Sequence, residues 1–151
     1  MWRASALPYL AAALTRFLQE YPWTSDGLSR TERRLLELAS EGIALGQAFP
    51  RMHEGEQAYY VTDLSLLALA DTLARSSPAL LTLTRPADAN GSTFRAVATI
   101  TDAGRSVLAG QLDKVAACGV DRWLGGVHLH SAGTMWRWDD ARQAVVQVMT
   151  E

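Results

Sequence analysis

The fold of this chain is decided by residues 28–110, which begin with LSRTERRLLELASEG (28–42). In this segment, Ser29 and Glu32 have the spacing of a capping box, in which a hydroxyl and a carboxylate bind the free backbone amides at a helix start. Leucines then recur at helical spacing, and Gly42 can end the helix in a left-handed conformation. The segment therefore predicts a capped helix that ends at this glycine.

Two more helices are expected directly after the first. Residues 45–52 have a helical pattern that we expect Pro50 to interrupt, because proline lacks the amide hydrogen that a continuing helix needs. Thr62 or Asp63 can cap a third helix, which reaches about Ala74. Its leucines cover more than one face, so this third helix is expected to be mostly buried.

Two segments with alternating apolar residues follow the three helices. Residues 81–84 and 94–100 each place apolar side chains on one face of an expected strand. Residues 85–93, with a turn sequence at Asn90, form the loop between them. A further helix is expected over residues 101–119, capped by the threonine at its start. Three helices followed by a hairpin is the element order of a winged helix, with the hairpin as the wing.

Together these elements predict a single α+β domain. Residues 1–27 are expected to supply an extra N-terminal helix, capped by Ser5, and a connector. Residues 28–118 form a winged-helix-like helical core with a β-hairpin wing, and residues 119–151 form short strands rich in tryptophan. We expect three such strands, at residues 127–130, 136–138 and 145–149. A chain of 151 residues with 48% apolar content can bury such a core without disulfides or a metal.

The charge and cysteine content limit the kinds of partner and the compartment that we expect for this protein. Lys and Arg total 14 against 16 Asp and Glu, so the formal net charge of −2 gives no overall attraction to phosphates. The single Cys118 cannot form an internal disulfide, which favours a reducing compartment, and we expect the protein in the cytoplasm. The apolar start is too short to span a bilayer and contains Arg16, which is untypical of a signal peptide, so no membrane partner is expected.

Short phrases in several places resemble one bacterial family. They are LPYLAAAL, GLSRTERRLLE, TDAGRSVLAG, and GVDRWLGGVHL followed by WRWD. As a set they resemble the C-terminal half of bacterial proteins grouped as domain of unknown function 1835, and the resemblance covers most of the chain. It implies no activity. Proteins of that family usually carry a further N-terminal region with its own polar motifs, and this chain is expected to begin downstream of that region.

The sequence carries no catalytic signature. Gly-x-Ser-x-Gly, Gly-x-Gly-x-x-Gly and Walker patterns are all missing, so we expect no cofactor and no enzymatic activity. Two alternatives remain open. His128 and His130 would share one strand face and could bind a metal, with Asp139 or Asp140 as a third ligand. Cys118 could act as a nucleophile if a histidine approached it in space.

A DNA-binding transcriptional regulator is the second hypothesis for a winged helix. In such proteins the third helix enters the major groove and needs basic or amide side chains on its outward face. Here that helix carries Arg75 against Asp63 and Asp71, so it is acidic and would repel phosphates. The glutamates beside the arginines of the first core helix are typical of a solvated face. The remaining candidates for nucleic-acid contacts are Arg30, Arg33, Arg34, Arg85 and Arg95.

The tryptophan-rich end favours a different function. Tryptophan and arginine are the residue types that most often anchor protein interfaces. The interaction candidates are Arg122, Trp123, Trp136, Arg137 and Trp138. The leading hypothesis is therefore a non-catalytic interaction or accessory module, which docks to a protein partner or forms a homodimer through the leading helix or these strands. The alternative is that the tryptophans pack the strands onto the helices, with Arg137 and Asp139 paired on the outer face.

Overall fold

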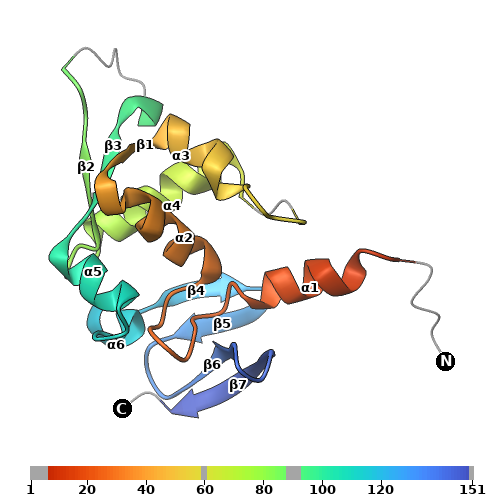
Figure 1. Cartoon of the computed structure of the whole chain (residues 1–151). Coiled ribbons are helices and arrows are strands. Elements are labelled where there is room, and N and C mark those ends of the chain that lie inside the picture. The colour runs from red at the N-terminus through yellow and green to blue at the C-terminus, as the bar shows by residue number, and fades with distance from the viewer. Residues whose placement is uncertain (1–6, 59–60, 88–92, 150–151) are drawn as a thin grey trace.

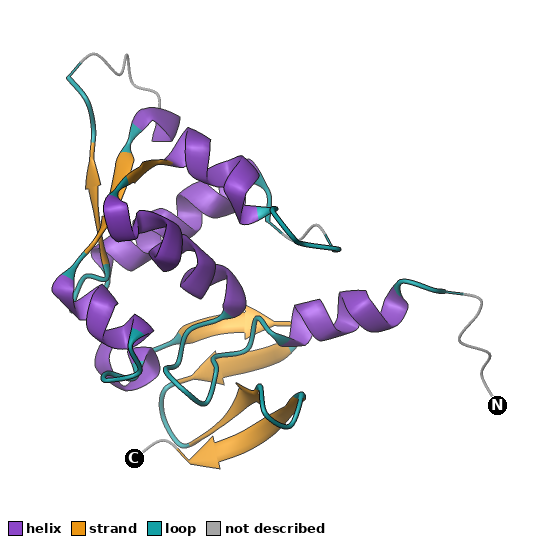
Figure 2. Cartoon of the chain, viewed as in Figure 1, coloured by secondary structure: helices purple, strands orange, loops and turns teal. Residues whose placement is uncertain are grey.

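The computed structural model describes residues 7–58, 61–87 and 93–149. A helical core with a small sheet lies above two C-terminal hairpins, and helix α1 (Leu10–Leu18) projects to one side (Figure 1). Figure 2 shows that helices make up most of the upper part and strands most of the lower part. The predicted mixed α+β architecture is therefore confirmed.

The core has the element order and strand pairing of a winged helix. Its elements are α2 (Arg30–Leu38), a 3-10 turn (Ala39–Glu41), β1 (Ile43–Ala44), α3 (Leu45–Met52), α4 (Asp63–Arg75), β2 (Leu81–Thr84) and β3 (Val97–Ile100). The three strands form one antiparallel sheet in the order β1-β3-β2. Ala98 of the central strand lies opposite Ile43 on one side and Leu83 on the other. The hairpin of β2 and β3 is the wing.

Side-chain caps explain where α2 and α4 begin. Ser29 Oγ accepts a hydrogen bond from the Glu32 amide at 3.2 Å, and Glu32 Oε2 accepts one from the Ser29 amide at 2.8 Å, so the predicted capping box is present. Thr62 Oγ1 caps α4 by accepting from the Ser65 amide at 3.2 Å. The expectation that α4 is mostly buried is wrong: more than half of its residues are exposed, because only one face packs into the core, through Leu66, Ala70 and Leu73. The first core helix and its 3-10 turn end at Gly42, whose φ of 81° suits glycine.

The structure differs from the prediction at Pro50. α3 runs through this proline and ends at Met52. A proline at this position removes one backbone hydrogen bond. Leu45, Ala48 and Met52 are buried in the core, and their packing holds the short helix together despite that loss.

The wing is shorter than expected. Phe94, expected in a strand, lies in a 3-10 turn (Thr93–Arg95), and β3 begins only after it. The carbonyl of Ala96 accepts a hydrogen bond from the Leu45 amide at 2.9 Å, so this stretch bonds the start of α3 instead of β2. The turn sequence expected at residues 90–91 lies outside the described residues, as does the expected cap at Ser5.

The single helix expected after the wing is two helices. The hydroxyl of Thr101 caps α5 (Asp102–Leu108), as predicted, by accepting a backbone hydrogen bond at 3.1 Å. That helix ends before Gly110, which has a φ of 68°. Asp113 then caps a separate helix, α6 (Lys114–Cys118), by accepting a backbone hydrogen bond at 2.9 Å.

The C-terminal part contains two hairpins, and thus one strand more than expected. The first pairs β4 (Asp121–Leu124) with β5 (Val127–His130), and the second pairs β6 (Thr134–Asp139) with β7 (Ala144–Met149). The extra strand, β4, shows no apolar alternation because one of its inward side chains is that of Arg122. The connector after α1 runs beside β6, where the Trp138 amide donates to the Pro22 carbonyl at 2.9 Å.

Two apolar clusters form the interior. The larger lies within the winged-helix core. The smaller consists of Tyr21, Val115, Leu124, Leu129, Met135 and Trp138. Charged side chains gather where α1, the connector, α2 and α6 meet the hairpins, and we call them the polar seam: Arg16, Glu20, Asp26, Glu32, Asp113, Lys114, Arg122 and Arg137. Most of these side chains are buried, so their partners decide what they contribute.

Glu32 connects the polar seam to the core. Its Oε2 completes the capping box, and its Oε1 accepts a hydrogen bond from Lys114 Nζ at 2.7 Å. Glu32 is only 4% exposed and Lys114 only 8%. Burial by itself raises the pKa of Glu32, but the nearby charges of Lys114 and Arg122 hold that pKa below its ordinary value of 4.5. The carboxylate is therefore charged in the folded chain.

Replacing Glu32 with glutamine should lower the free energy of unfolding by about 3–5 kcal/mol, because Lys114 would become a buried charge without a partner. Urea unfolding measures the change. The double variant Glu32→Gln/Lys114→Met should recover part of the loss. The control is Glu37→Gln, since Glu37 lies 3.7 Å from Arg34 and is half exposed. It should change stability by less than about 0.5 kcal/mol. Equal stability of the two single variants would contradict this interpretation.

Acid should destabilise the protein through Glu32 and Asp113. Burial raises the pKa of Asp113, but hydrogen bonds from Arg137 and the Ala116 amide bring it below its ordinary value. A carboxyl group with a lower pKa in the folded than in the unfolded chain stabilises the fold above its ordinary pKa. That contribution is lost as the pH falls, so the free energy of unfolding should decrease below about pH 5, and less steeply in Glu32→Gln. A flat profile down to about pH 3 would argue against these assignments.

Candidate functional site

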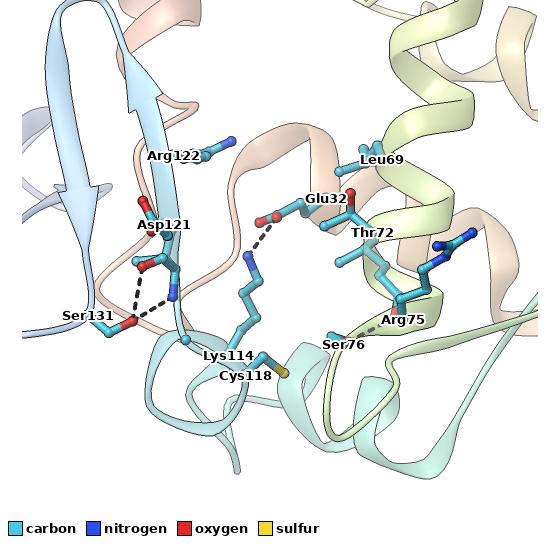
Figure 3. Close-up of a pocket in the computed structure, with 13 residues that line it drawn as sticks. Glu32, Leu69, Thr72, Arg75, Ser76, Lys114, Cys118, Asp121, Arg122 and Ser131 are labelled. Carbon is cyan, nitrogen blue, oxygen red and sulfur yellow. Dashed lines mark hydrogen bonds and ion pairs between the residues drawn. The ribbon is translucent and has the colours of Figure 1, made fainter.

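A pocket of about 730 Å³ lies between α4, α6 and the β4–β5 hairpin. Figure 3 shows Leu69 of α4 on one side and Arg122 of β4 on the other, with the Glu32–Lys114 pair between them. Cys118, at the end of α6, lines the pocket next to this pair. The pocket therefore opens directly onto the polar seam.

Arg122 differs from the other charged groups of the seam. One of its terminal nitrogens donates to the backbone carbonyl of Glu20. Its Nε is buried and has no hydrogen-bond partner, and no carboxylate among the described residues forms an ion pair with it. Arg122 was predicted to contact a partner, but its side chain points inward, toward the pocket (Figure 3).

Cys118 does not have the surroundings of an activated nucleophile. Burial raises the pKa of its thiol, so the thiol stays protonated near neutral pH. Its Sγ donates to the Pro78 carbonyl at 3.5 Å. His128 and His130 are exposed on β5 and do not line the pocket. The described part of the chain therefore brings no histidine to this thiol.

The two histidines of β5 share one face, as predicted, and lie beside Trp123. The rings of His128 and Trp123 stack with their centres 4.8 Å apart, and the His130 ring lies 5.7 Å from His128. His128 Nε2 lies 2.6 Å from Asp121 Oδ1, and this hydrogen bond lowers the pKa of Asp121. These four side chains form an exposed polar and aromatic face on the β4–β5 hairpin.

The carboxylates expected to complete a metal site bond elsewhere. Asp139 accepts a hydrogen bond from the Arg142 amide at 3.1 Å, and Asp140 accepts one from the Trp138 indole at 3.1 Å. Both bonds lie within the β6–β7 hairpin. Over the residues that the structure describes, no group of three His, Cys, Asp or Glu side chains is arranged to hold a metal ion.

The tryptophans and arginines of the C-terminal strands divide into outward and inward groups. Trp123 is 70% exposed and Trp136 is 40% exposed, so both can contact a partner. Trp138 shares a strand face with Trp136 but is only 1% exposed, because it packs in the smaller cluster beside the connector.

Arg137 is also buried and does not form the pair with Asp139 that the packing alternative required. Two of its nitrogens bind the carboxylate of Asp113, one of them at 3.1 Å. Asp139 instead pairs with Arg142, 3.5 Å away in the hairpin turn. Of the five interaction candidates, Trp123 and Trp136 are thus the ones that offer large exposed surfaces.

Helix α1 exposes an apolar stripe that continues beyond the edge of the domain. Leu7, just before the helix, and Leu10 and Leu14 within it are each about half exposed or more. The same stripe continues to Phe17 and Leu18, which pack against the smaller cluster. Figure 1 shows the first turns of α1 standing clear of the hairpins. Within the described residues, no helix combines the length and apolar character needed to cross a membrane.

The third helix of the winged-helix core, α4, lacks the surface of a DNA-reading helix. Its exposed charged residues are Asp63, Asp71 and Arg75, and its most exposed large apolar side chain is Leu64. The only arginine on this helix donates to Asp71 at 2.9 Å, so its charge is neutralised within the chain. The acidic character expected from the sequence is therefore present on the outward face.

The arginines at the start of α2 have partners inside the molecule. Arg30 pairs with Glu56 at 2.8 Å and donates to Gln19 at 2.5 Å. Arg33 pairs with Asp26 and lies over the Trp23 ring. Arg34 pairs with Glu37 at 3.7 Å and with Glu54 at 3.8 Å. These side chains hold the connector and the loop after α3. Arg85 and Arg95 lie at the two ends of the wing loop.

Lys114 was not predicted as a site residue from the sequence, although one signal for it was present. Lys114 is the only lysine in a chain that otherwise uses arginine. It is buried against Glu32, 82 positions away in sequence. The spacing of residues gives no indication of such a distant pair.

No protein-family model, curated protein or solved structure matches this chain. The winged-helix description therefore rests on the observed element order and strand pairing. The function has to be argued from the site geometry.

The charges of α4 predict that the protein does not bind duplex DNA through this helix. Fluorescence anisotropy of a labelled mixed-sequence duplex should show no saturable binding at low salt, because binding to phosphates needs uncompensated cations. The comparison protein is Asp63→Lys/Asp71→Lys, which makes α4 basic and should gain salt-sensitive binding. Saturable binding by the native chain that weakens as salt is added would show the prediction to be wrong.

Proposed function

We propose that this chain is a non-catalytic protein-interaction module and that α1 is its docking element. The observation that carries the proposal is the apolar stripe of Leu7, Leu10 and Leu14, which is uncovered at one end of α1 and packed at the other. An amphipathic helix that extends its apolar face beyond its own domain is a common recognition element for an apolar groove or a second helix. Covering the stripe would remove apolar surface from water.

A second copy of this chain is the partner that the composition of α1 favours. The segment LAAALT (10–15) carries no charge, so two such helices can approach without electrostatic repulsion. Its three alanines allow close contact between helix backbones. The charged Arg16 is buried at the base of the helix, where it pairs with Glu20 at 2.5 Å. A twofold pair of α1 helices would bury the same stripe on both copies.

The outer face of the β4–β5 hairpin offers a second contact surface. Trp123 is the most exposed tryptophan that the structure describes, and the stacked His128 ring holds it in place. Large rigid aromatic side chains lose little entropy on binding. The alternative, a DNA-binding regulator, has no support from the charges of α4.

Sedimentation or multi-angle light scattering over a range of concentrations tests the proposal. The native chain should form a dimer, and Leu10→Ser/Leu14→Ser should weaken it by at least about tenfold for each leucine, because each loses its apolar burial. Leu64→Ser, which changes an exposed leucine on α4, should leave the dimer unchanged. Trp123→Ala measures how much the outer face of the β4–β5 hairpin contributes to the affinity of the dimer.

The outcomes separate the surfaces. A native chain that stays monomeric at every concentration would refute self-association through α1. A dimer that resists the two serine substitutions and dissociates with Trp123→Ala would move the interface to the β4–β5 hairpin. Urea unfolding of each variant should match the native chain, because the substituted side chains are on the surface.

A further inference from the structure

One cation that lines the pocket forms no salt bridge with a carboxylate. Glu32 binds Lys114, and Arg75 on the rim binds Asp71. Asp121, which also lines the pocket, is hydrogen-bonded to His128, and the two form an ion pair only when that ring is protonated. Of the cations that line this pocket in the described structure, Arg122 is the one without a salt bridge, although its charge acts on Glu32 nearby.

The free hydrogen-bonding groups of Lys114 and Arg122 in the pocket are donors. Both carboxylate oxygens of Glu32 already accept hydrogen bonds, from Lys114 and from the Ser29 amide. Lys114 uses one of its three ammonium hydrogens in that bond. Arg122 uses one of its five N–H groups, to the Glu20 carbonyl, and its Nε has no acceptor. A guest that completes these bonds has to supply acceptors.

The hydroxyl groups that line the pocket are already bonded within the chain. Thr72 Oγ1 donates to the Ala68 carbonyl at 2.8 Å, and Ser76 Oγ donates to the Leu73 carbonyl at 2.9 Å. Ser131 Oγ accepts from the Val120 amide at 2.6 Å. They can shape the pocket, but charge and spare donors come from Arg122 and Lys114.

We propose that this pocket binds a small organic molecule that carries a carboxylate or phosphate group, with Arg122 as the residue that binds the oxyanion. The guanidinium group suits this role because its planar N–H groups match the geometry of both oxyanions. Lys114, held in place by Glu32, adds a second positive charge. Leu69 and Val120 supply apolar surface, and the volume of about 730 Å³ leaves room for an organic group beside the anion.

The test uses the full chain in phosphate-free buffer with phenyl phosphate, benzoate and neutral benzyl alcohol as probes. Backbone NMR locates the binding site, and the rate of Cys118 alkylation by iodoacetamide reports whether the pocket is occupied. We expect the two anions to shift the amides of Gly119, Asp121 and Ser131 and to slow the alkylation. Benzyl alcohol should do neither. The tighter of the two anions identifies the preferred oxyanion.

Substitution of Arg122 provides the second arm. Arg122→Gln should weaken anion binding about tenfold or more, because it removes a charged donor. Arg122→Lys keeps the charge and should retain part of the affinity. It replaces the glutamine variant in the test if that variant does not fold. The matched control is Arg105→Gln, since Arg105 is an exposed arginine of α5 that pairs with Asp102 and does not line the pocket. It should bind the anions as the native chain does.

Three results would overturn the proposal: no amide shift with either anion, equal affinity for benzyl alcohol and benzoate, or native affinity in a folded Arg122→Gln variant. The test is independent of the proposed dimer, because Leu10 and Leu14 do not line this pocket. A monomeric chain that binds anions would refute the proposed dimer alone, and a dimer that binds neither anion would refute the proposed pocket alone.

Discussion

The carboxylate of Glu32 holds together parts of the chain that are far apart in sequence. Through Ser29 it completes the cap of α2, and through Lys114 it fixes the start of α6 against the core. Both contacts use the same buried carboxylate, so water cannot replace one of them without also reaching the other. A buried ion pair adds little net stability compared with apolar residues of the same size. Its main effect here is geometric: it sets how the C-terminal hairpins sit on the winged-helix core.

The polar seam explains why this fold has a pocket instead of one continuous apolar core. Charged residues from α1, the connector, α2, α6 and the hairpins meet in it, and each pair needs a particular distance. Gly27 shows how close the chains lie: a Cβ there would be 2.8 Å from the Val115 backbone nitrogen. Long side chains such as those of Lys114 and Arg122 fill this junction loosely, and the space left between them and α4 is the pocket.

Local chemistry was predictable from the sequence, and distant pairing was not. The capping box at Ser29, the cap at Thr101 and the helices of the core depend on neighbouring residues, so spacing revealed them. Spacing did not reveal β1, β4 or the break between α5 and α6. Arg137 is buried because it pairs with Asp113, which is distant in sequence. The arginines of α2 find their partners in the connector and in the loop after α3. No spacing rule gives such partners. The interaction candidates therefore divide into inward and outward side chains, and only the folded chain determines that orientation.

Glu20 connects the proposed docking helix to the proposed anion pocket through hydrogen bonds on both sides. Arg122 donates to the carbonyl of Glu20, and the side chain of Glu20 binds Arg16 in α1 and the Thr31 hydroxyl in α2. A guest that satisfies the free donors of Arg122 would therefore act on the group that also supports the base of α1. Winged helices that bind DNA use the outward face of their third helix. In this chain that face is acidic, and the pocket beside α4 instead contains the unpartnered Nε of Arg122, at the seam.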